Sequence, residues 1–342
     1  MAEARRPLAI GPATDALVSR ATGRGRLALI AAVSNGGEHH YSAFGPPSAV
    51  PDGDALFEIG SITKAFTGTL LADMHERREV DLRDPVSRWL DPAELPAWPG
   101  REPTLIDLAT HRAGLPNAPR AMARRELAFS IGLLRSDPWA AVTEVEYRRA
   151  VAAIRPKPAG RRLRYSSVGF GLLGDALAAA TEKPYEQLLR ERVCRPLGLN
   201  RAWIDVPARE RPTLLTGHTP RGRPQPPLED LMPGAGSLRS SAAEMLRLLD
   251  ATMDPPAGPA GRALALAQTP QADGRGRMST GLGWLLLDRR RRSRVVWHNG
   301  GTWGFRSFAA AVPQRRVAVV VLSNTARSVD RLGFALVEKL SG

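Results

Sequence analysis

A serine and a lysine stand three positions apart, as Ser61 and Lys64, in the stretch 57–74, which reads FEIGSITKAFTGTLLADM. Apolar residues recur at every fourth position of this stretch, which predicts an amphipathic helix that begins near Ser61, behind Gly60. Side chains three positions apart on a helix share a face. A serine becomes nucleophilic when a neighbouring base takes its proton, and the unpaired N–H groups at a helix start stabilise a developing oxyanion. The pair therefore predicts acyl-transfer chemistry.

The choice of lysine at position 64 favours this interpretation. Of the 48 basic residues, only Lys64, Lys157, Lys183 and Lys339 are lysines. Arginine stays protonated in proteins, whereas a lysine that is desolvated near other cations can lose its proton and act as a base. The alternative is a capping serine followed by a solvated lysine, because this spacing also arises by chance. Motifs elsewhere in the chain are needed to distinguish the catalytic pair from a capping serine with a solvated lysine.

Composition limits the class of protein. The 342 residues, 43% of them hydrophobic, suffice for one large domain or two closely packed ones. No apolar run is long enough to span a bilayer, and no apolar segment follows the two N-terminal arginines as it would in a secretory signal. The single cysteine, Cys194, is expected to be a buried packing residue and fits a reducing compartment. We therefore expect a cytoplasmic protein with no membrane partner.

The net charge of +14 would fit a nucleic-acid-binding protein. The arginines, however, are spread over the whole chain, and the densest run, 289–292, lies between two predicted strands, where a solvated turn is expected. No RRM, zinc-finger or basic-region pattern accompanies the charge. No His-Glu-x-x-His or paired Cys/His spacing indicates a metal, and no Gly-x-Ser-x-Gly motif indicates an α/β-hydrolase. We expect no nucleic acid, no metal and no cofactor.

The chain has strand and helix patterns at both ends and is mostly helical between them. Thr14 is expected to cap a short helix through Ala21, and Pro233 to Gly236 is expected to be a loop. Capping boxes and apolar spacing predict helices at 104–111, 143–154, 168–181, 185–193, 241–249 and 326–340. Apolar or alternating runs predict strands at 27–33, 41–44, 283–287, 294–298, 305–312 and 316–323.

The N-terminal hairpin and the C-terminal meander most economically share one antiparallel sheet, with the two terminal helices packed on it. The predicted fold class is therefore α+β, an antiparallel sheet flanked by N- and C-terminal helices with an inserted helical lobe. We expect the sheet lobe to comprise 1–80 and 225–342, the helical lobe to comprise 81–224, and the active site to lie between them.

Two further motifs follow Ser61. The first, RYSSVGF at 164–170, places Tyr165 on a loop between helices, and the second, WHNGGTWGF at 297–305, is a predicted strand that ends in glycines. Alone, a loop tyrosine is more often a packing residue, and a strand histidine is more often a satisfied core group. Three motifs in order are more specific. With them the chain resembles the serine beta-lactamase and penicillin-binding superfamily, closest to the branch of class C beta-lactamases, DD-peptidases and esterases.

The resemblance runs from about Leu27 to the C-terminus and includes the segments 108–116 and 195–199. It implies the beta-lactamase/transpeptidase-like fold and the following site: Ser61 as the acylated nucleophile, Lys64 and Tyr165 as carriers of its proton and the leaving group's, the N–H groups of Ser61 and Gly301 as the oxyanion hole, and His298, Asn299, Gly300 and Ser167 as further substrate-binding residues.

Two positions depart from the family's pattern. Ser167 stands where the family usually has an asparagine, whose amide contacts the lysine and the substrate's acyl amide. His298 stands where secreted beta-lactamases have a lysine, which holds the carboxylate of a beta-lactam. Both changes weaken the recognition of a carboxylated amide and leave the acylation residues in place.

We therefore expect a cofactor-free, cytoplasmic serine hydrolase that acts through a Ser61 acyl-enzyme on small-molecule esters or amides. Short aryl esters should be turned over with a kcat/KM roughly a hundredfold above that for nitrocefin. One alternative is a beta-lactamase or D-alanyl-D-alanine carboxypeptidase, and another is a non-catalytic binding module of the same fold. The sequence leaves the oligomeric state open.

Overall fold

A computed structural model describes residues 10–22, 27–46, 50–131, 133–134, 136–160, 162–228, 231–289 and 293–342. Its helices are α1 Ile10–Ala21, α2 Thr63–Glu76, α3 Leu105–Ala109, α4 Arg120–Ser130, α5 Glu144–Ala152, α6 Ser167–Thr181, α7 Tyr185–Leu189, α8 Pro233–Gly236, α9 Ala242–Met253, α10 Pro259–Ala267 and α11 Asp330–Ser341. Its strands are β1 Leu29–Asn35, β2 Glu38–Phe44, β3 Leu56–Glu58, β4 Arg239–Ser241, β5 Ala272–Asp273, β6 Met278–Thr280, β7 Leu285–Asp288, β8 Arg294–Gly301, β9 Arg306–Val312 and β10 Val317–Ser323.

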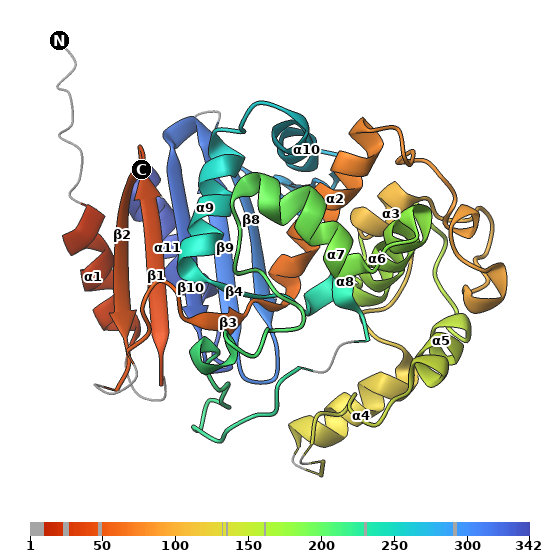
Figure 1. Cartoon of the computed structure of the whole chain (residues 1–342), viewed down its shortest axis with the longest axis horizontal. Helices are drawn as coiled ribbons and strands as arrows, with labels where there is room; N and C mark the ends of the chain where they lie inside the picture. The colour runs from red at the N-terminus through yellow and green to blue at the C-terminus, as the bar shows by residue number, and fades with distance from the viewer. Residues whose placement is uncertain are drawn as a thin grey trace.

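The centre of the fold is an 8-stranded sheet with the order β2-β1-β10-β9-β8-β7-β6-β5, in which neighbouring strands are antiparallel (Figure 1). The N-terminal hairpin joins the C-terminal meander through the pair β1 and β10, whose register runs from Leu29 opposite Ser323 to Asn35 opposite Val317. The expectation that both ends of the chain share one sheet is therefore confirmed, and the fold is α+β. Strands β3 and β4 form a separate 2-stranded sheet.

Both faces of the sheet are covered. Successive side chains of a strand point to opposite faces. Along β10, Val319 and Val321 belong to the cluster that contains α1 and α11, whereas Val320 and Leu322 belong to the larger core on the other face. All residues of β10 are buried. The uninterrupted apolar sequence of β10 follows from this, because each side chain meets a helix layer.

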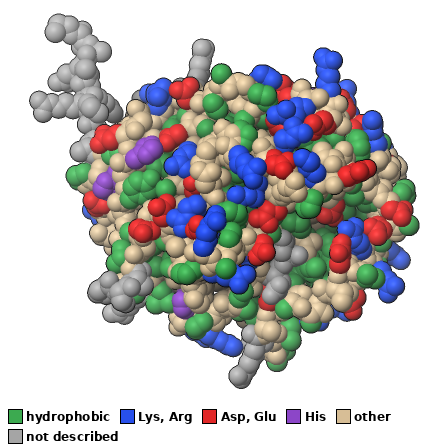
Figure 2. Space-filling view, viewed as in Figure 1, with side chains coloured by type: hydrophobic (Ala, Val, Ile, Leu, Met, Phe, Trp, Pro, Cys, Tyr) green, Lys and Arg blue, Asp and Glu red, His purple; other side chains and the backbone are tan. Residues whose placement is uncertain are grey.

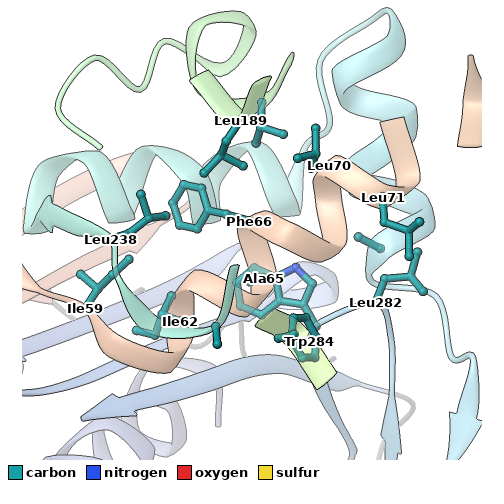
Figure 3. Packing of buried hydrophobic residues seen from close by; sticks show 14 of the residues in the cluster. Ile59, Ile62, Ala65, Phe66, Leu70, Leu71, Leu189, Leu238, Leu282 and Trp284 are labelled. Atoms are coloured by element: carbon teal, nitrogen blue, oxygen red, sulfur yellow. The ribbon is translucent and has the colours of Figure 1, made fainter. Parts of the chain in front are cut away.

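Helix α2 lies between the sheet and the helices α3 to α7 (Figure 1). The predicted single apolar stripe is wrong for this helix, because every residue from Thr63 to Met74 is buried. Phe66 and Leu70 lie toward Leu189, and Ala65 lies toward Trp284 on another side (Figure 3). A helix that is buried all round must hold any ionisable side chain out of water. Lys64 is one such side chain.

Several local expectations need correction. Thr14 does not cap α1, because that helix already begins at Ile10 and the Thr14 hydroxyl donates to the Ile10 carbonyl inside it. The expected loop 233–236 is the single helical turn α8. The C-terminal helix begins at Asp330 rather than at 326. Part of the arginine run, 290–292, lies outside the described residues, and the proposed lobe boundaries stay a prediction.

The surface mixes charges of both signs. On the face in Figure 2, basic and acidic side chains are interspersed among uncharged and hydrophobic ones. Within the described ranges, no helix combines the length and the apolar character that crossing a membrane requires.

Candidate active site

Ser61 lies in a 3-10 turn, Gly60–Ile62, that connects β3 to α2. Gly60 has a φ of 54°, and a Cβ on it would lie 2.6 Å from the amide nitrogen of Gly301. The end of β8 therefore packs directly against the turn that carries Ser61, and only glycine permits this approach. The same turn is fixed by the Ser307 hydroxyl, which donates to the Ile59 carbonyl at 2.7 Å. This packing places the backbone amides of Ser61 and Gly301 in neighbouring positions, as an oxyanion hole requires.

Lys64 is fully buried and points at Ser61. Its Nζ donates to Ser61 Oγ at 3.1 Å, to Ser167 Oγ at 3.2 Å and to the Ala235 carbonyl at 2.7 Å. No carboxylate of the described residues forms an ion pair with it. Burial without a counter-charge disfavours the ammonium and lowers the pKa of Lys64 to about 7. The lysine is therefore close to half neutral near pH 7 and is a competent base for Ser61.

Tyr165 lies on the loop before α6, where the Ser166 hydroxyl caps the helix by accepting from the Gly169 amide at 2.9 Å. The Ser61 side chain lies close enough to the phenol to oppose the rise of its pKa, and Lys64 Nζ lies 5.0 Å from its ring centroid. Its surroundings desolvate the hydroxyl and raise the pKa of Tyr165, although 36% of the residue is exposed. The phenol is therefore protonated at neutral pH. It can relay a proton, while Lys64 is the base.

Two histidines lie beside Tyr165. The ring centroid of His111 is 4.4 Å from that of Tyr165, and the centroid of His298 is 6.1 Å from it. Burial, followed by the charge of Lys64, lowers the pKa of His298 to about 3 and that of His111 well below its usual value. Both imidazoles are thus neutral at neutral pH. His111 accepts from the Ser166 amide through Nδ1 at 3.2 Å, and so helps to hold the tyrosine loop.

His298 lies deeper than its neighbours on β8. The sequence places it among the substrate-binding residues; in the structure its side chain is 0% exposed and does not line the pocket, and its role stays a prediction. Its Nδ1 donates to the Asn299 carbonyl at 2.5 Å. The ring packs beside Tyr165, with the two ring centroids 6.1 Å apart, and lies close enough to Lys64 to feel its charge.

Asn117 was missed by the sequence analysis. Its Oδ1 accepts from the Ser167 hydroxyl at 2.9 Å and from the Ser167 amide at 3.2 Å, and Ser167 also receives the bond from Lys64. Asn117 is exposed and lines the pocket. Because Oδ1 is occupied, its N–H groups are the ones left to face a substrate. The residue follows directly after the motif at 108–116, which is the only sequence signal that marks it.

These residues surround one pocket of about 950 Å³. Ser61, Tyr165, Ser167 and the β8 residues Asn299, Gly300 and Gly301 line it. The observed arrangement brings together the residues predicted for the site, with the side chain of His298 buried beside Tyr165. Among known proteins, a family model described as Beta-lactamase matches residues 14–338.

The chain belongs to the beta-lactamase family. The D-alanyl-D-alanine-carboxypeptidase/endopeptidase AmpH of Escherichia coli K12 is 27% identical to it over 321 residues, covering 88% of this chain and 80% of AmpH. A beta-lactamase of the same strain is 27% identical over 303 residues, covering 79% of this chain and 75% of that protein.

Solved structures support the family fold. The class C beta-lactamase from Rhodobacter sphaeroides superposes with a TM-score of 0.80 at 25% identity, covering 97% of this chain and 100% of that one. A beta-lactamase/D-alanine carboxypeptidase from Pseudomonas syringae reaches a TM-score of 0.81 at 19% identity, covering 96% of this chain and 99% of that one. The resemblance predicted from three motifs is confirmed, and with it the assignment to the serine hydrolases of this family.

Within this beta-lactamase fold the pocket has two different walls. One is apolar and includes Phe129, Trp139 and Trp303; the rings of Phe129 and Trp303 meet edge to face at 5.1 Å. Trp303 is held there by donating through Nε1 to Asp137 Oδ2 at 2.5 Å. A polar part of the lining, the polar wall, includes Thr219, Arg223, Arg306, Ser328 and Asp330. The pocket can therefore hold a substrate with an apolar end and a polar end.

Proposed function

We propose that this protein hydrolyses esters or small amides through an acyl-enzyme on Ser61. The observation that carries the proposal is the 3.1 Å contact between Lys64 Nζ and Ser61 Oγ, made by a lysine that is buried without a counter-charge. A surface lysine would be charged and could not take a proton at neutral pH. A non-catalytic module of the same fold would have no use for a buried, partly neutral lysine aimed at a half-buried serine that lines a pocket.

The reaction follows from the geometry. Neutral Lys64 takes the hydroxyl proton while Ser61 Oγ bonds to the substrate's carbonyl carbon. The carbonyl oxygen becomes an oxyanion, held by the N–H groups of Ser61 and Gly301. As the adduct collapses, the bond to the leaving group breaks, and the leaving oxygen or nitrogen receives the proton from Lys64 through Tyr165. Water then gives a proton to the same amine and attacks the acyl carbon. The bond between this carbon and Ser61 Oγ breaks, Oγ takes the proton back from Lys64, and a carboxylic acid is released.

A second candidate function is the hydrolysis of beta-lactams or D-alanyl peptides, the activities named for the relatives. One observation favours it. The Asn117 amide stands beside Ser167 and offers N–H groups to the pocket, so the missing asparagine of the tyrosine motif is replaced from another loop. An acyl amide carbonyl would find its partner there.

Labelling with a fluorophosphonate tests the proposal. Intact-mass analysis should find one adduct, and peptide mapping should place it on Ser61, with none on Ser61→Ala. Equal labelling of the Ser61→Ala protein would refute the nucleophile. A panel of aryl acetates, nitrocefin and a D-alanyl-D-alanine peptide then separates the two candidate functions by their kcat/KM values.

We keep a cytoplasmic location within this proposal. Cys194 is buried, and a chain with a single cysteine fits a reducing compartment. Fractionation of cells that express the full-length protein would test the location.

A further inference from the structure

Arg306 occupies an unusual position at the start of β9. It stands directly opposite Gly301 in the antiparallel register of β8 and β9. Because Gly301 has no side chain, the guanidinium lies over it: a Cβ on Gly301 would be 3.0 Å from Nη1 and 3.1 Å from Cζ of Arg306. Arg306 also lines the pocket. A cation therefore lies beside the backbone amide expected to bind the oxyanion.

Only one edge of this guanidinium is used by the protein. Nη1 donates to the carbonyls of Thr302 and Phe305, both at 2.7 Å. Among the described residues, no acceptor takes Nη2 or Nε, and no carboxylate forms an ion pair with Arg306. Partial burial lowers the pKa of Arg306, yet the guanidinium stays charged at neutral pH. Nη2 and Nε are thus left without a protein acceptor among the described residues, on a side chain that lines the pocket.

The surroundings of Arg306 select the kind of anion. Arg223 lies on the same wall, as do the hydroxyls of Thr219 and Ser328. Asp330 also lies there; its Oδ2 accepts from the Asn299 amide at 3.1 Å, and its charge acts on Arg306 from beyond ion-pair distance. A nearby carboxylate repels a doubly charged phosphate more strongly than a singly charged group. A carboxylate is therefore the anion that this wall fits best.

We propose that Arg306 is a specificity-determining residue that binds a carboxylate of the substrate through Nη2 and Nε. A guanidinium fork matches a carboxylate in two parallel hydrogen bonds. The proposal rests on the acyl-transfer function proposed above and narrows its substrates to esters or amides that carry a carboxylate near the scissile bond. The buried His298 does not line the pocket, whereas Arg306 does.

A matched pair of substrates tests the role of Arg306. The substrates are 4-acetoxybenzoate and its methyl ester, which share the acyl group and differ in one charge. Arg306→Gln removes the cation, and the wild-type ratio of the two kcat/KM values should fall about ten- to a hundredfold, the scale of hydrogen bonds to a charged group. The control is Arg331→Gln, which removes an exposed positive charge next to Asp330 that does not line the pocket. Its ratio should match the wild type.

Arg306→Lys keeps the charge and can still donate to Thr302 and Phe305, so it replaces the glutamine variant if that variant does not fold. Arg306→Lys should retain part of the preference for 4-acetoxybenzoate over its methyl ester, because the lysine can make one of the two hydrogen bonds to the carboxylate. A ratio unchanged from wild type in a folded Arg306→Gln protein would overturn the proposal. An equal fall in Arg331→Gln would also overturn it, because the effect would then come from net charge.

Binding to Ser61→Ala separates this proposal from the proposed function. Calorimetry on that variant measures the affinity for 4-acetoxybenzoate whether or not any ester is turned over. The affinity should exceed that for the methyl ester, and the excess should vanish in the Ser61→Ala, Arg306→Gln double variant. Equal affinities for the acid and the methyl ester would refute the carboxylate site. Tighter binding of phenyl phosphate than of benzoate, lost with Arg306, would assign the site to phosphate instead.

Discussion

The lowered pKa of Lys64 predicts how the rate depends on pH. The active form is the neutral amine, so kcat/KM for an uncharged aryl ester should rise with pH through about 7 and then level off. At the ordinary value of 10.5, only about one lysine in 3,000 would be neutral at pH 7; with a pKa of about 7, about half are neutral. Burial therefore raises the fraction of active enzyme by roughly three orders of magnitude.

No other titratable group near Ser61 explains a rise of kcat/KM with pH through about 7, the ascending limb of the pH profile. The pKa of His298 is lowered to about 3 and that of His111 well below its usual range, so both are neutral throughout the assay. The pKa of Tyr165 is raised, so the phenol stays protonated. The assay is initial-rate hydrolysis between pH 5 and 9, corrected for spontaneous cleavage. Lys64→Arg should lose the limb and at least about a hundredfold in kcat. A limb that persists in that variant with near-normal rates would refute the reasoning.

The same shift has a consequence for stability. The folded-state pKa of Lys64 lies below the unfolded one, so between about 7 and 10.5 the unfolded chain binds a proton that the folded chain does not. Stability should therefore rise with pH across this window, by up to about 1.4 kcal/mol per pH unit, and Lys64→Met should remove that slope. At low pH the Lys64→Met variant should gain stability, because it no longer buries an amine that would otherwise be protonated. The loss of the Lys64 hydrogen bonds to Ser61, Ser167 and Ala235 offsets part of this gain. The slope of urea stability against pH is the decisive measurement, and an unchanged slope would contradict the shift.

Contacts elsewhere in the site predict three more outcomes. Asn117→Ala should lower kcat/KM for a small amide roughly tenfold more than for an aryl ester, because an acyl amide loses a hydrogen-bond partner; equal losses would mean that Asn117 only holds Ser167. Lengthening the acyl chain from acetyl to hexanoyl should raise kcat/KM up to about fourfold per methylene, because the chain contacts the apolar wall. In Phe129→Ala the increase per methylene should be smaller. An equal increase in both proteins would exclude the apolar wall as the acyl site. Gly300→Ala should abolish activity and lower the Tm, because its Cβ would lie 2.0 Å from the Ile59 carbonyl; wild-type melting would contradict this.

Local pattern was enough for the residues closest to the chemistry. Ser61 and Lys64 are three positions apart, so helix geometry alone brings them together. The long apolar runs of β1 and β10 and the spacing in α6 are strong signals, and these elements were predicted. The short elements β4, β5 and α8 were not, because two to four residues carry no measurable periodicity. The burial of α2 on all sides was also missed, since it depends on what packs against the helix.

The polar pocket residues depend on tertiary contacts that no local pattern records. Asn117 reaches Ser167 across 50 positions of sequence. Arg306 covers Gly301 because β8 and β9 pair in one particular register. A slip of one residue would turn the arginine to the other face of the sheet and away from the pocket. Neither residue carries a motif of its own; the only sequence signal is that Asn117 directly follows the segment 108–116.

Asn117 and Arg306 affect the expected preference between esters and carboxylated amides. The expected hundredfold preference for aryl esters over nitrocefin assumes that Ser167 and His298 leave an amide and a carboxylate without partners. In the structure Asn117 supplies an amide beside Ser167, and Arg306 supplies a cation beside Gly301. Restoring a lysine at position 298 would place a second ammonium in a fully buried position near Lys64, rather than in the pocket. The margin between esters and carboxylated amides is therefore controlled by Asn117 and Arg306, and it should widen when either is removed.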